Sequence, residues 1–328
     1  MLKIGVLGLG HLGNIHLKCL LEIPQYEVVG VFDPNPKAVA RAVEKYQVAA
    51  FDSVEALLEA VEVVDIVTPT ITHFELAKQV VAAGKHFFIE KPLTHTLQEA
   101  EALCALVEQQ PIKAQVGHVE RFNPALLAIE DKAIAPMFVE AHRLALFNPR
   151  GTDVSVVLDL MIHDLDIILK LIPHDVKAVQ ASGVALVSPS ADIANARIEF
   201  VNGAIVNITA SRISMKNMRK LRIFQSDAYL SLDFLNKQTE VVRLHEQLPE
   251  EAEQCMELDT ALGKRYIELD SPAAKPNNAI KMELEAFATS ILSDTPIKVG
   301  LEDGLKALRL AYWIMEEIDA HQKRLEQA

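Results

Sequence analysis

Short apolar runs alternate with stretches of helical periodicity along the N-terminal part of the chain. Uninterrupted aliphatic runs are typical of strands buried on both faces. We predict strands at residues 3–7, 27–32, 63–67, 86–91 and 113–116. The intervening periodicity predicts helices at residues 14–22, 37–46, 54–60, 74–83 and 97–109. This alternation implies right-handed crossovers and therefore an α/β domain with a parallel, doubly wound sheet.

The pattern changes after residue 122, where strand-like runs follow one another without helices between them. Strand character begins near residue 138 and continues at residues 178–186, 194–200, 204–211, 221–225, 229–234 and 239–244. Asn202-Gly203 between two runs is a hairpin signal, and the short linkers favour an antiparallel sheet. Residues 245–265 are acidic and give no assignment, and helices follow at 279–292 and 301–325.

A chain of 328 residues exceeds one ordinary hydrophobic core, so we predict two domains. The first covers residues 1–122 and the second covers residues 123–328. It stays open whether the last helices pack back on the first domain.

One helix, predicted at residues 155–172, is apolar around most of its circumference and must be largely buried. Its polar stripe consists of Asp159, His163, Asp166 and Lys170. The stripe is either a solvated face or a line of groups facing a cleft, and its narrowness favours the cleft. Asp159 stands four residues before His163, so it can orient the imidazole and raise its basicity, as a general base requires.

A glycine-rich loop follows the first predicted strand and opens a helix. Its candidate ligand residues are Gly8, Gly10, His11, Leu12 and Gly13. Asp33 ends the second strand, twenty residues after Gly13. This context predicts dinucleotide binding, and the alternative is a tight turn without a ligand. Asp33 would bind ribose hydroxyls and repel a 2′-phosphate, so we predict NAD rather than NADP, although Lys37 leaves NADP open. His16 is expected to be a packing residue or a cofactor neighbour.

Glu90 and Lys91 end the fourth strand, and Pro92 stops it because proline cannot continue the hydrogen-bond ladder. Ligands of open parallel sheets bind outside the carboxyl ends of the strands, so Lys91 is placed to meet a substrate. The alternative for Lys91 is a surface ion pair with Glu90 or with another nearby acidic residue. The other cofactor-binding candidates at this sheet edge are Thr68, Pro69, His73 and Glu90. His73 either opens its helix or contacts the ligand.

The composition narrows the classes of function. Half of the residues are apolar and 23% are charged, as in a soluble globular protein. The net charge of −13 argues against nucleic-acid and membrane partners. No apolar run approaches the roughly 18 residues that span a bilayer, and a strand begins at the N-terminus without room for a signal peptide. Three widely spaced cysteines lack metal-ligand spacing, so we expect a cytoplasmic protein without a metal site.

A local basic segment departs from this acidic composition. It contains Arg212, Lys216, Arg219, Lys220 and Arg222. Arginine and lysine are natural partners of a diphosphate, so the segment is a candidate site for a nucleotide-sugar. The alternative is a basic strand edge that contacts acidic surface in an oligomer or discourages edge pairing.

Taken together, these motifs resemble the glucose–fructose oxidoreductase, inositol dehydrogenase and MocA (Gfo/Idh/MocA) family. The matching residues are Gly8-x-Gly10-x-x-Gly13-x-x-His16, Thr68-Pro69 with His73, Glu90-Lys91-Pro92, Gly117-His118, Asp159-x-x-x-His163 and Asp303-Gly304-Leu305. The resemblance spans essentially the whole chain. It implies a nicotinamide-binding Rossmann domain and a second α/β domain with an open, mainly antiparallel sheet. It also implies a homodimer or homotetramer, often formed through that sheet.

Under this resemblance Lys91, Asp159 and His163 correspond to a catalytic trio that oxidises a ring hydroxyl of a sugar to a ketone. His163 would take the hydroxyl proton while Lys91 orients the hydroxyl and stabilises negative charge on oxygen, although which of the two is the base stays open. Residues 117–124 look like members that oxidise the 3-hydroxyl of UDP-linked N-acetylhexosamines. The candidate substrate-binding residues are His118, Arg121, Asn123, Asp166, Lys216 and Arg219.

Three functions follow from these expectations. The first is an NAD-dependent dehydrogenase of a nucleotide-linked sugar, with free inositol or a hexose as its nearest variant. The second is a glycosidase that uses bound NAD transiently and releases no net NADH. The third is a non-catalytic NAD-responsive regulator, against which the joint presence of Lys91, Asp159 and His163 argues.

Overall fold

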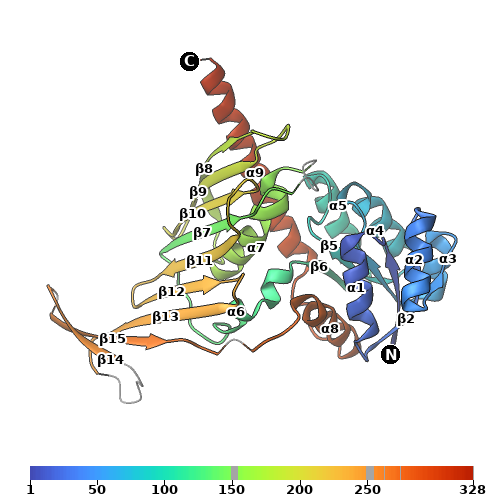
Figure 1. Cartoon of the computed structure of the whole chain (residues 1–328), viewed down its shortest axis with the longest axis horizontal. Helices are drawn as coiled ribbons and strands as arrows, with labels where there is room; N and C mark the ends of the chain where they lie inside the picture. Colours follow the sequence, from blue (N-terminus) through green and yellow to red (C-terminus); the bar gives the residue numbers. More distant parts are fainter. Residues whose placement is uncertain (149–153, 249–254, 262, 274, 328) are drawn as a thin grey trace. The chain divides into compact units, whose positions relative to one another are not determined.

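The computed structural model describes residues 1–148, 154–248, 255–261, 263–273 and 275–327 (Figure 1). The chain divides into two compact units. Unit 1 contains residues 1–122 and 278–309, and unit 2 contains residues 123–277 and 310–328. None of the helices in these described ranges combines the length and the hydrophobicity needed to cross a bilayer.

Unit 1 is built on a six-stranded parallel sheet. Its strands are β1 (Leu2–Leu7), β2 (Tyr26–Phe32), β3 (Ala49–Ala50), β4 (Val63–Ile66), β5 (His86–Glu90) and β6 (Ala114–Gly117). They lie in the order β3-β2-β1-β4-β5-β6, and every neighbouring pair is parallel. The order reverses between β1 and β4, which is where an open α/β sheet has its ligand-binding crevice. The predicted doubly wound parallel sheet is confirmed.

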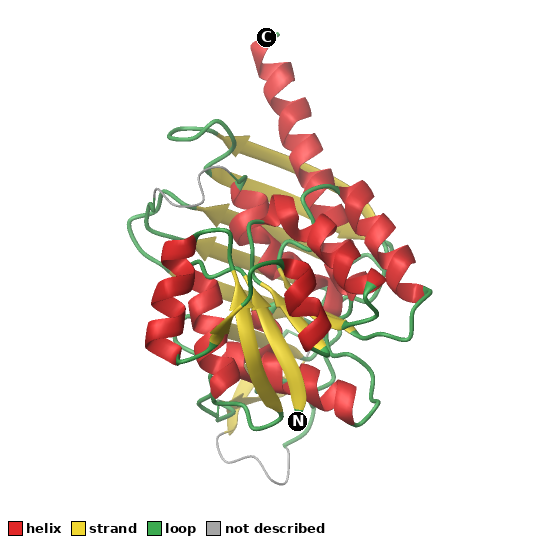
Figure 2. Ribbon diagram, turned by 90° about the vertical axis from the view of Figure 1, so that its right-hand side faces the viewer, coloured by secondary structure: helices red, strands yellow, loops and turns green. Residues whose placement is uncertain are grey.

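Helices cover both faces of this sheet (Figure 2). They are α1 (His11–Leu21), α2 (Pro36–Tyr46), α3 (Val54–Ala60), α4 (His73–Ala82), α5 (Leu97–Glu108) and α8 (Ala279–Leu292), with short 3-10 turns η1 (Thr70–Thr72) and η2 (Val119–Phe122). The core on one face contains residues of α1, α2 and α8. On the other face Leu57 of α3 packs against Gly5 of β1. Local capping explains several helix starts, and Thr96 with Glu99 forms a complete capping box before α5.

Unit 2 is built on a nine-stranded, mostly antiparallel sheet. Its strands are β7 (Phe138–Leu144), β8 (Val176–Val184), β9 (Ile193–Phe200), β10 (Ile205–Ser211), β11 (Met218–Phe224), β12 (Ala228–Asp233), β13 (Gln238–His245), β14 (Cys255–Thr260) and β15 (Gly263–Asp270). Their order is β14-β15-β13-β12-β11-β7-β10-β9-β8, and only the pair β7–β10 among these strands is parallel. The predicted open, mainly antiparallel sheet is confirmed.

The segment that the sequence left unassigned, residues 245–265, contains β14 and the start of β15. Both strands are half-buried or exposed along their length. Because neither face enters a core, the segment lacks the alternation of apolar and polar residues that marks a half-buried strand. Pairing with β13 through β15 places it in the sheet.

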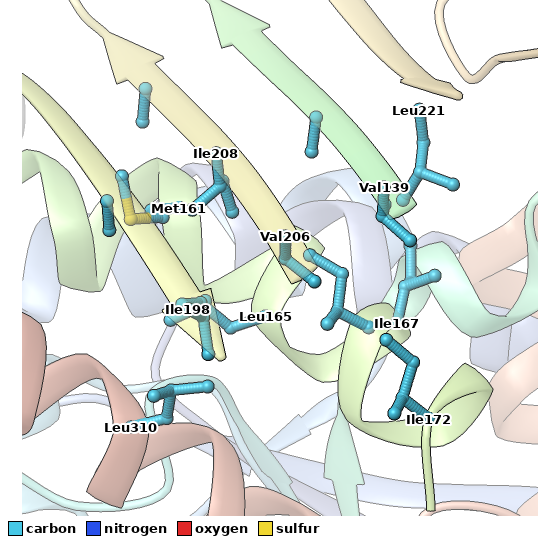
Figure 3. Packing of buried hydrophobic residues seen from close by; sticks show 14 of the residues in the cluster. Val139, Met161, Leu165, Ile167, Ile172, Ile198, Val206, Ile208, Leu221 and Leu310 are labelled. Carbon is cyan, nitrogen blue, oxygen red and sulfur yellow. The ribbon is translucent and has the colours of Figure 1, made fainter. Parts of the chain in front are cut away.

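The apolar helix of unit 2 packs against one face of this sheet together with the middle of α9 (Leu301–Glu326), from Leu310 to Ile318. Its regular part is α7 (Ile162–Leu171), preceded by a π-helical turn η3 (Val157–Met161), and a short α6 (Pro124–Leu127) lies earlier in the chain. Figure 3 shows Met161, Leu165, Ile167 and Ile172 next to strand residues such as Ile208. A regular helix over residues 155–172 was predicted, so the π-helical turn is a local correction to that prediction.

Candidate functional site

The glycine loop of unit 1 joins the end of β1 to the start of α1. Gly8 has a φ of +97°, and a Cβ on Gly13 would lie 2.1 Å from the carbonyl oxygen of Gly8. These two glycines are therefore required by the backbone itself. A Cβ on Gly10, in contrast, would meet no atom of the described residues within 4 Å, apart from its own chain neighbours. The space beside Gly10 is left open at the N-terminus of α1, where backbone N–H groups and the helix dipole favour an anion such as a pyrophosphate.

Asp33 lies directly beside this loop, at the end of β2. One carboxylate oxygen accepts a hydrogen bond from the N–H of Leu9 at 2.7 Å, and the other accepts from Asn35 N–H at 2.8 Å. The carboxylate is thus fixed where a ribose bound over the loop would present its hydroxyls. Together with the open space at Gly10, this donor and acceptor set fits a nicotinamide dinucleotide. On the first turn of α1, His11 is exposed and Leu12 is half-buried.

The loops that follow β4 and β5 are tied together by His73. Its ring nitrogens lie 2.9 Å from the carbonyl oxygen of Thr68 and 3.0 Å from that of Pro92. His73 is the first residue of α4 and is only 1% exposed, and its burial lowers the pKa of the ring. Two roles were predicted for His73, to open its helix or to contact the ligand. The structure places His73 at the start of α4. Thr68 is half-buried and Pro69 exposed at the same edge of the sheet.

Lys91 follows β5 directly and is half-buried. Its backbone N–H donates to the Glu90 carboxylate at 3.2 Å. The other oxygen of Glu90 lies 3.1 Å from Nε2 of His16, whose Nδ1 faces Asp65 on β4 at 3.1 Å. Sequence reasoning treated His16 as a packing residue or cofactor neighbour and did not single out Asp65. An aspartate inside the apolar run 63–67 was the available signal.

The polar stripe of unit 2 begins in the π-helical turn and continues along α7. Asp159 and His163 are half-buried, Asp166 is 1% exposed and Lys170 is exposed. The i, i+4 argument assumed a regular α-helix, whereas Asp159 belongs to η3 and His163 to the first turn of α7. π-helical turns inside helices are frequently found at functional sites. The roles of Asp159 and His163 stay predictions.

Asp164 is a residue that sequence reasoning missed. Its carboxylate forms a two-pronged pair with the Arg143 guanidinium of β7, at 2.7 and 2.9 Å. Both side chains are almost fully buried, with 4% and 3% of their surface exposed. The pair fixes α7, and with it the stripe residues, to the sheet.

The basic segment does not form one surface. Arg212 is buried and donates to the carbonyl oxygen of Val154. Lys220 and Arg222 alternate with buried Leu221 along β11, and they pair with Asp233 and Glu140 respectively. Arg219 lies opposite Arg143 in the β7–β11 register, on the face that carries α7. A single diphosphate site formed by all five residues is therefore excluded, and Lys216 and Arg219, both exposed, remain candidates.

Three further candidates lie close in sequence to residue 122, where the first segment of unit 1 ends. His118 is 1% exposed. Arg121 is 8% exposed and pairs with Asp303 of unit 1 at 3.3 Å. In unit 2, Asn123 caps α6 through Ala125 N–H and donates to the carbonyl oxygen of Phe234 at 3.1 Å. These contacts give Arg121 and Asn123 structural roles, and substrate binding by either stays a prediction.

Comparison with known proteins covers both units. Residues 2–118 match the family model described as an oxidoreductase family with an NAD-binding Rossmann fold, and residues 140–231 match the GFO/IDH/MocA C-terminal domain. The chain is 35% identical to UDP-N-acetylglucosamine 3-dehydrogenase of Acidithiobacillus ferrooxidans over 98% of its own length and 99% of that protein. It is 26% identical to inositol 2-dehydrogenase of Rhizobium meliloti, over 94% of each chain.

Solved structures give the same grouping. A structure of the Acidithiobacillus ferrooxidans enzyme matches with a TM-score of 0.87 and 34% identity, over 97% of this chain and 98% of that one. Scyllo-inositol dehydrogenase from Lactobacillus casei, solved with NAD(H) and scyllo-inositol, matches with a TM-score of 0.78 over 98% of both chains. At 20% identity, the second match shows a shared fold only.

Proposed function

Because this chain belongs to the Gfo/Idh/MocA family of oxidoreductases, we propose that it oxidises a ring hydroxyl of a nucleotide-linked sugar to a ketone with NAD. A UDP-N-acetylhexosamine is the proposed substrate. The observation that carries this proposal lies within unit 1. Lys91 follows β5 at the carboxyl edge of the sheet, and the glycine loop follows β1 at the same edge, with only β4 between the two strands. A dinucleotide held by the loop would therefore have a lysine ammonium on its own sheet edge.

The proposed cofactor is NAD. Its support is the open space at Gly10, the N–H groups at the start of α1 and the fixed Asp33 carboxylate. A 2′-phosphate would meet the negative charge of Asp33, which disfavours NADP. When bound, NAD supplies the hydride acceptor, and the protein supplies position and charge.

In the proposed reaction, the Lys91 ammonium donates a hydrogen bond to the substrate hydroxyl. It stabilises the negative charge that grows on that oxygen as the carbon–hydrogen bond breaks. His163 accepts the hydroxyl proton, and Asp159 keeps the imidazole oriented for that transfer.

Substrate recognition is proposed to include Lys216 and Arg219. Both carry positive charge on an exposed side chain, and Arg219 lies on the α7 face of the sheet. A guanidinium suits a diphosphate because it can donate two parallel hydrogen bonds. The full-length relative named for UDP-N-acetylglucosamine supports a substrate of this class.

We further propose a cytoplasmic homodimer or homotetramer. Three free cysteines, two of them half-buried, suit a reducing compartment. The nine-stranded sheet offers a surface for assembly, on which the rings of Phe138, Phe224 and Tyr229 contact one another. Light scattering of the purified protein would give the mass of the assembly.

The test is a screen for NADH formation with UDP-N-acetylhexosamines, free hexoses and inositols, each offered with NAD and with NADP. Turnover of a UDP-sugar with NAD, abolished in Lys91→Ala, is the expected result. Turnover of free polyols without turnover of any UDP-sugar would contradict the proposed nucleotide-sugar substrate. Preference for NADP would contradict the role given to Asp33.

A further inference from the structure

Four ionisable side chains meet in the interior of unit 1. His16 comes from α1, Asp65 from β4, Glu90 from the end of β5 and Glu283 from α8. Glu90 is 7% exposed and the other three are fully buried. Buried charges are costly unless they are paired, so a cluster of this kind requires a specific arrangement of protons.

The contacts of His16 define that arrangement. Its Nδ1 lies 3.1 Å from Asp65 Oδ2, and its Nε2 lies 3.1 Å from Glu90 Oε1. A neutral imidazole has one N–H donor, whereas two ionised carboxylates facing both nitrogens need two donors. Burial alone would lower the pKa of His16, but the charge of Asp65, the hydrogen bond to Asp65 and the nearby Glu90 carboxylate raise it well above its usual value. The two carboxylates on either side of the ring therefore favour the protonated form of His16.

Glu283 completes the cluster, and its full burial favours the protonated acid. Among the described residues, neither of its carboxylate oxygens has a hydrogen-bond partner. Burial, followed by the charge of Glu90, raises the pKa of Glu283 well above its usual value. Burial raises the pKa of Asp65 as well, and the neighbouring His16 partly offsets this rise.

The cluster reaches Lys91 through Glu90. While Oε1 of Glu90 faces His16, Oε2 accepts the backbone N–H of Lys91 at 3.2 Å. Gly117, paired with Glu90 across β5 and β6, leaves room for this carboxylate, because a Cβ there would lie 2.7 Å from Oε1. On the opposite side of the cluster from Lys91, His16 belongs to α1, which begins in the glycine loop. His16 is thus a link between the helix of the cofactor loop and the strand end that carries Lys91.

We propose that His16, fixed by Asp65, is a positioning residue. It holds Glu90, and through Glu90 the backbone of Lys91, at a fixed position relative to the glycine loop. This inference rests on the proposed function, since it takes Lys91 to orient the substrate hydroxyl. Displacement of a reacting group by about 1 Å can lower turnover roughly a hundredfold. Loss of the link should therefore lower kcat while leaving substrate and NAD binding nearly unchanged.

A metal site is the competing interpretation of the same residues. The ligand atoms of His16, Glu90 and Glu283 all lie within 4.8 Å of one another. A metal would need Nε2 of His16 without its proton. This nitrogen lies 3.1 Å from Glu90 Oε1 but has no hydrogen-bond partner among the described residues. Metal analysis of the purified protein separates the two interpretations.

Two variants break the link at different points. His16→Gln removes the imidazole, and Gly117→Ala displaces the Glu90 carboxylate without changing His16 or Lys91. Each should lower kcat for a UDP-N-acetylhexosamine by roughly 10- to 100-fold, with both Michaelis constants changed less than about threefold. Because both variants break one link, the double variant should be no slower than the slower single variant.

The matched control is Tyr26→Phe, which removes a buried hydrogen bond to the Leu284 carbonyl oxygen on α8 but leaves the link intact. It should lower the melting temperature with kcat unchanged. Unchanged kcat in both link variants, losses that multiply in the double variant, or one bound metal ion per chain would each overturn the positioning role. Full turnover in Lys91→Ala would instead overturn the proposed function, so the two failures are distinguishable.

Discussion

The buried pair between Arg143 and Asp164 gives a stability prediction with a definite magnitude. The guanidinium and the carboxylate meet at 2.7 and 2.9 Å, and neither side chain exposes more than 4% of its surface. Asp164→Ala leaves the buried guanidinium without its ionised partner. Breaking such a pair costs about 3–5 kcal/mol, so unit 2 should lose that much of its free energy of unfolding.

Urea unfolding followed by tryptophan fluorescence measures this loss in the right unit. The chain has a single tryptophan, Trp313, which packs against the core of unit 2. Lys177→Ala is the matched control, because the Lys177–Glu199 pair joins neighbouring strands of the same sheet at 2.6 Å but is 60% and 39% exposed. Loss of this pair should cost about 1 kcal/mol or less.

A double variant separates an unpaired charge from lost packing. Arg143→Met combined with Asp164→Leu removes both charges and should recover most of the stability that Asp164→Ala loses, because apolar replacements of buried pairs are often neutral or stabilising. The reasoning is refuted if Asp164→Ala costs no more than Lys177→Ala, or if the double variant is as unstable as Asp164→Ala.

Three other predictions follow from the described contacts. Gly10→Ala should weaken NAD binding measured by calorimetry and leave the melting temperature unchanged, whereas Gly13→Ala should lower the melting temperature. An equal fall in melting temperature in both variants would contradict the open space at Gly10. Burial raises the pKa of Glu283, so its contribution to stability is present below the unfolded-state pKa and is lost as pH rises from about 4.5 through the folded-state pKa. Glu283→Gln should reduce this loss when the free energy of unfolding is measured against pH. An unchanged dependence on pH would contradict the prediction. Arg219→Ala should raise the Michaelis constant for a UDP-sugar, while Lys220→Ala on the opposite face should not, and equal effects would retire the phosphate role of Arg219.

Much of the fold followed from local patterns. In unit 1, the apolar runs predicted the positions of the strands. Every residue of β4 and β6 is buried, so these strands have no exposed face that would carry alternating polar residues. Alternation identified β9 and β10 in unit 2 for a related reason, since one face of each enters the core. Strands β14 and β15 were not predicted, because backbone pairing with neighbouring strands holds them in the sheet and their side chains are not buried in a core.

The candidate site was predicted less completely, for a physical reason. The glycine loop and the Lys91 strand end are contiguous in sequence, so their spacing carries the signal. The pairing of His16 with Asp65 joins residues 49 positions apart, and that of Arg143 with Asp164 joins residues 21 positions apart. Such contacts depend on how helices pack on sheets. The sequence did not show which residues of the basic segment share a surface, because alternation along β11 sends neighbouring residues to opposite faces.

We propose that this protein transfers a hydride from a sugar ring carbon to NAD. The most direct measurement combines NADH absorbance with mass spectrometry of a UDP-N-acetylhexosamine incubated with the protein and NAD. The account predicts one NADH for each nucleotide-sugar that loses two hydrogen atoms, and no product with Lys91→Ala. Cleavage of the sugar from its nucleotide without net NADH, or turnover that persists in Lys91→Ala, would contradict it.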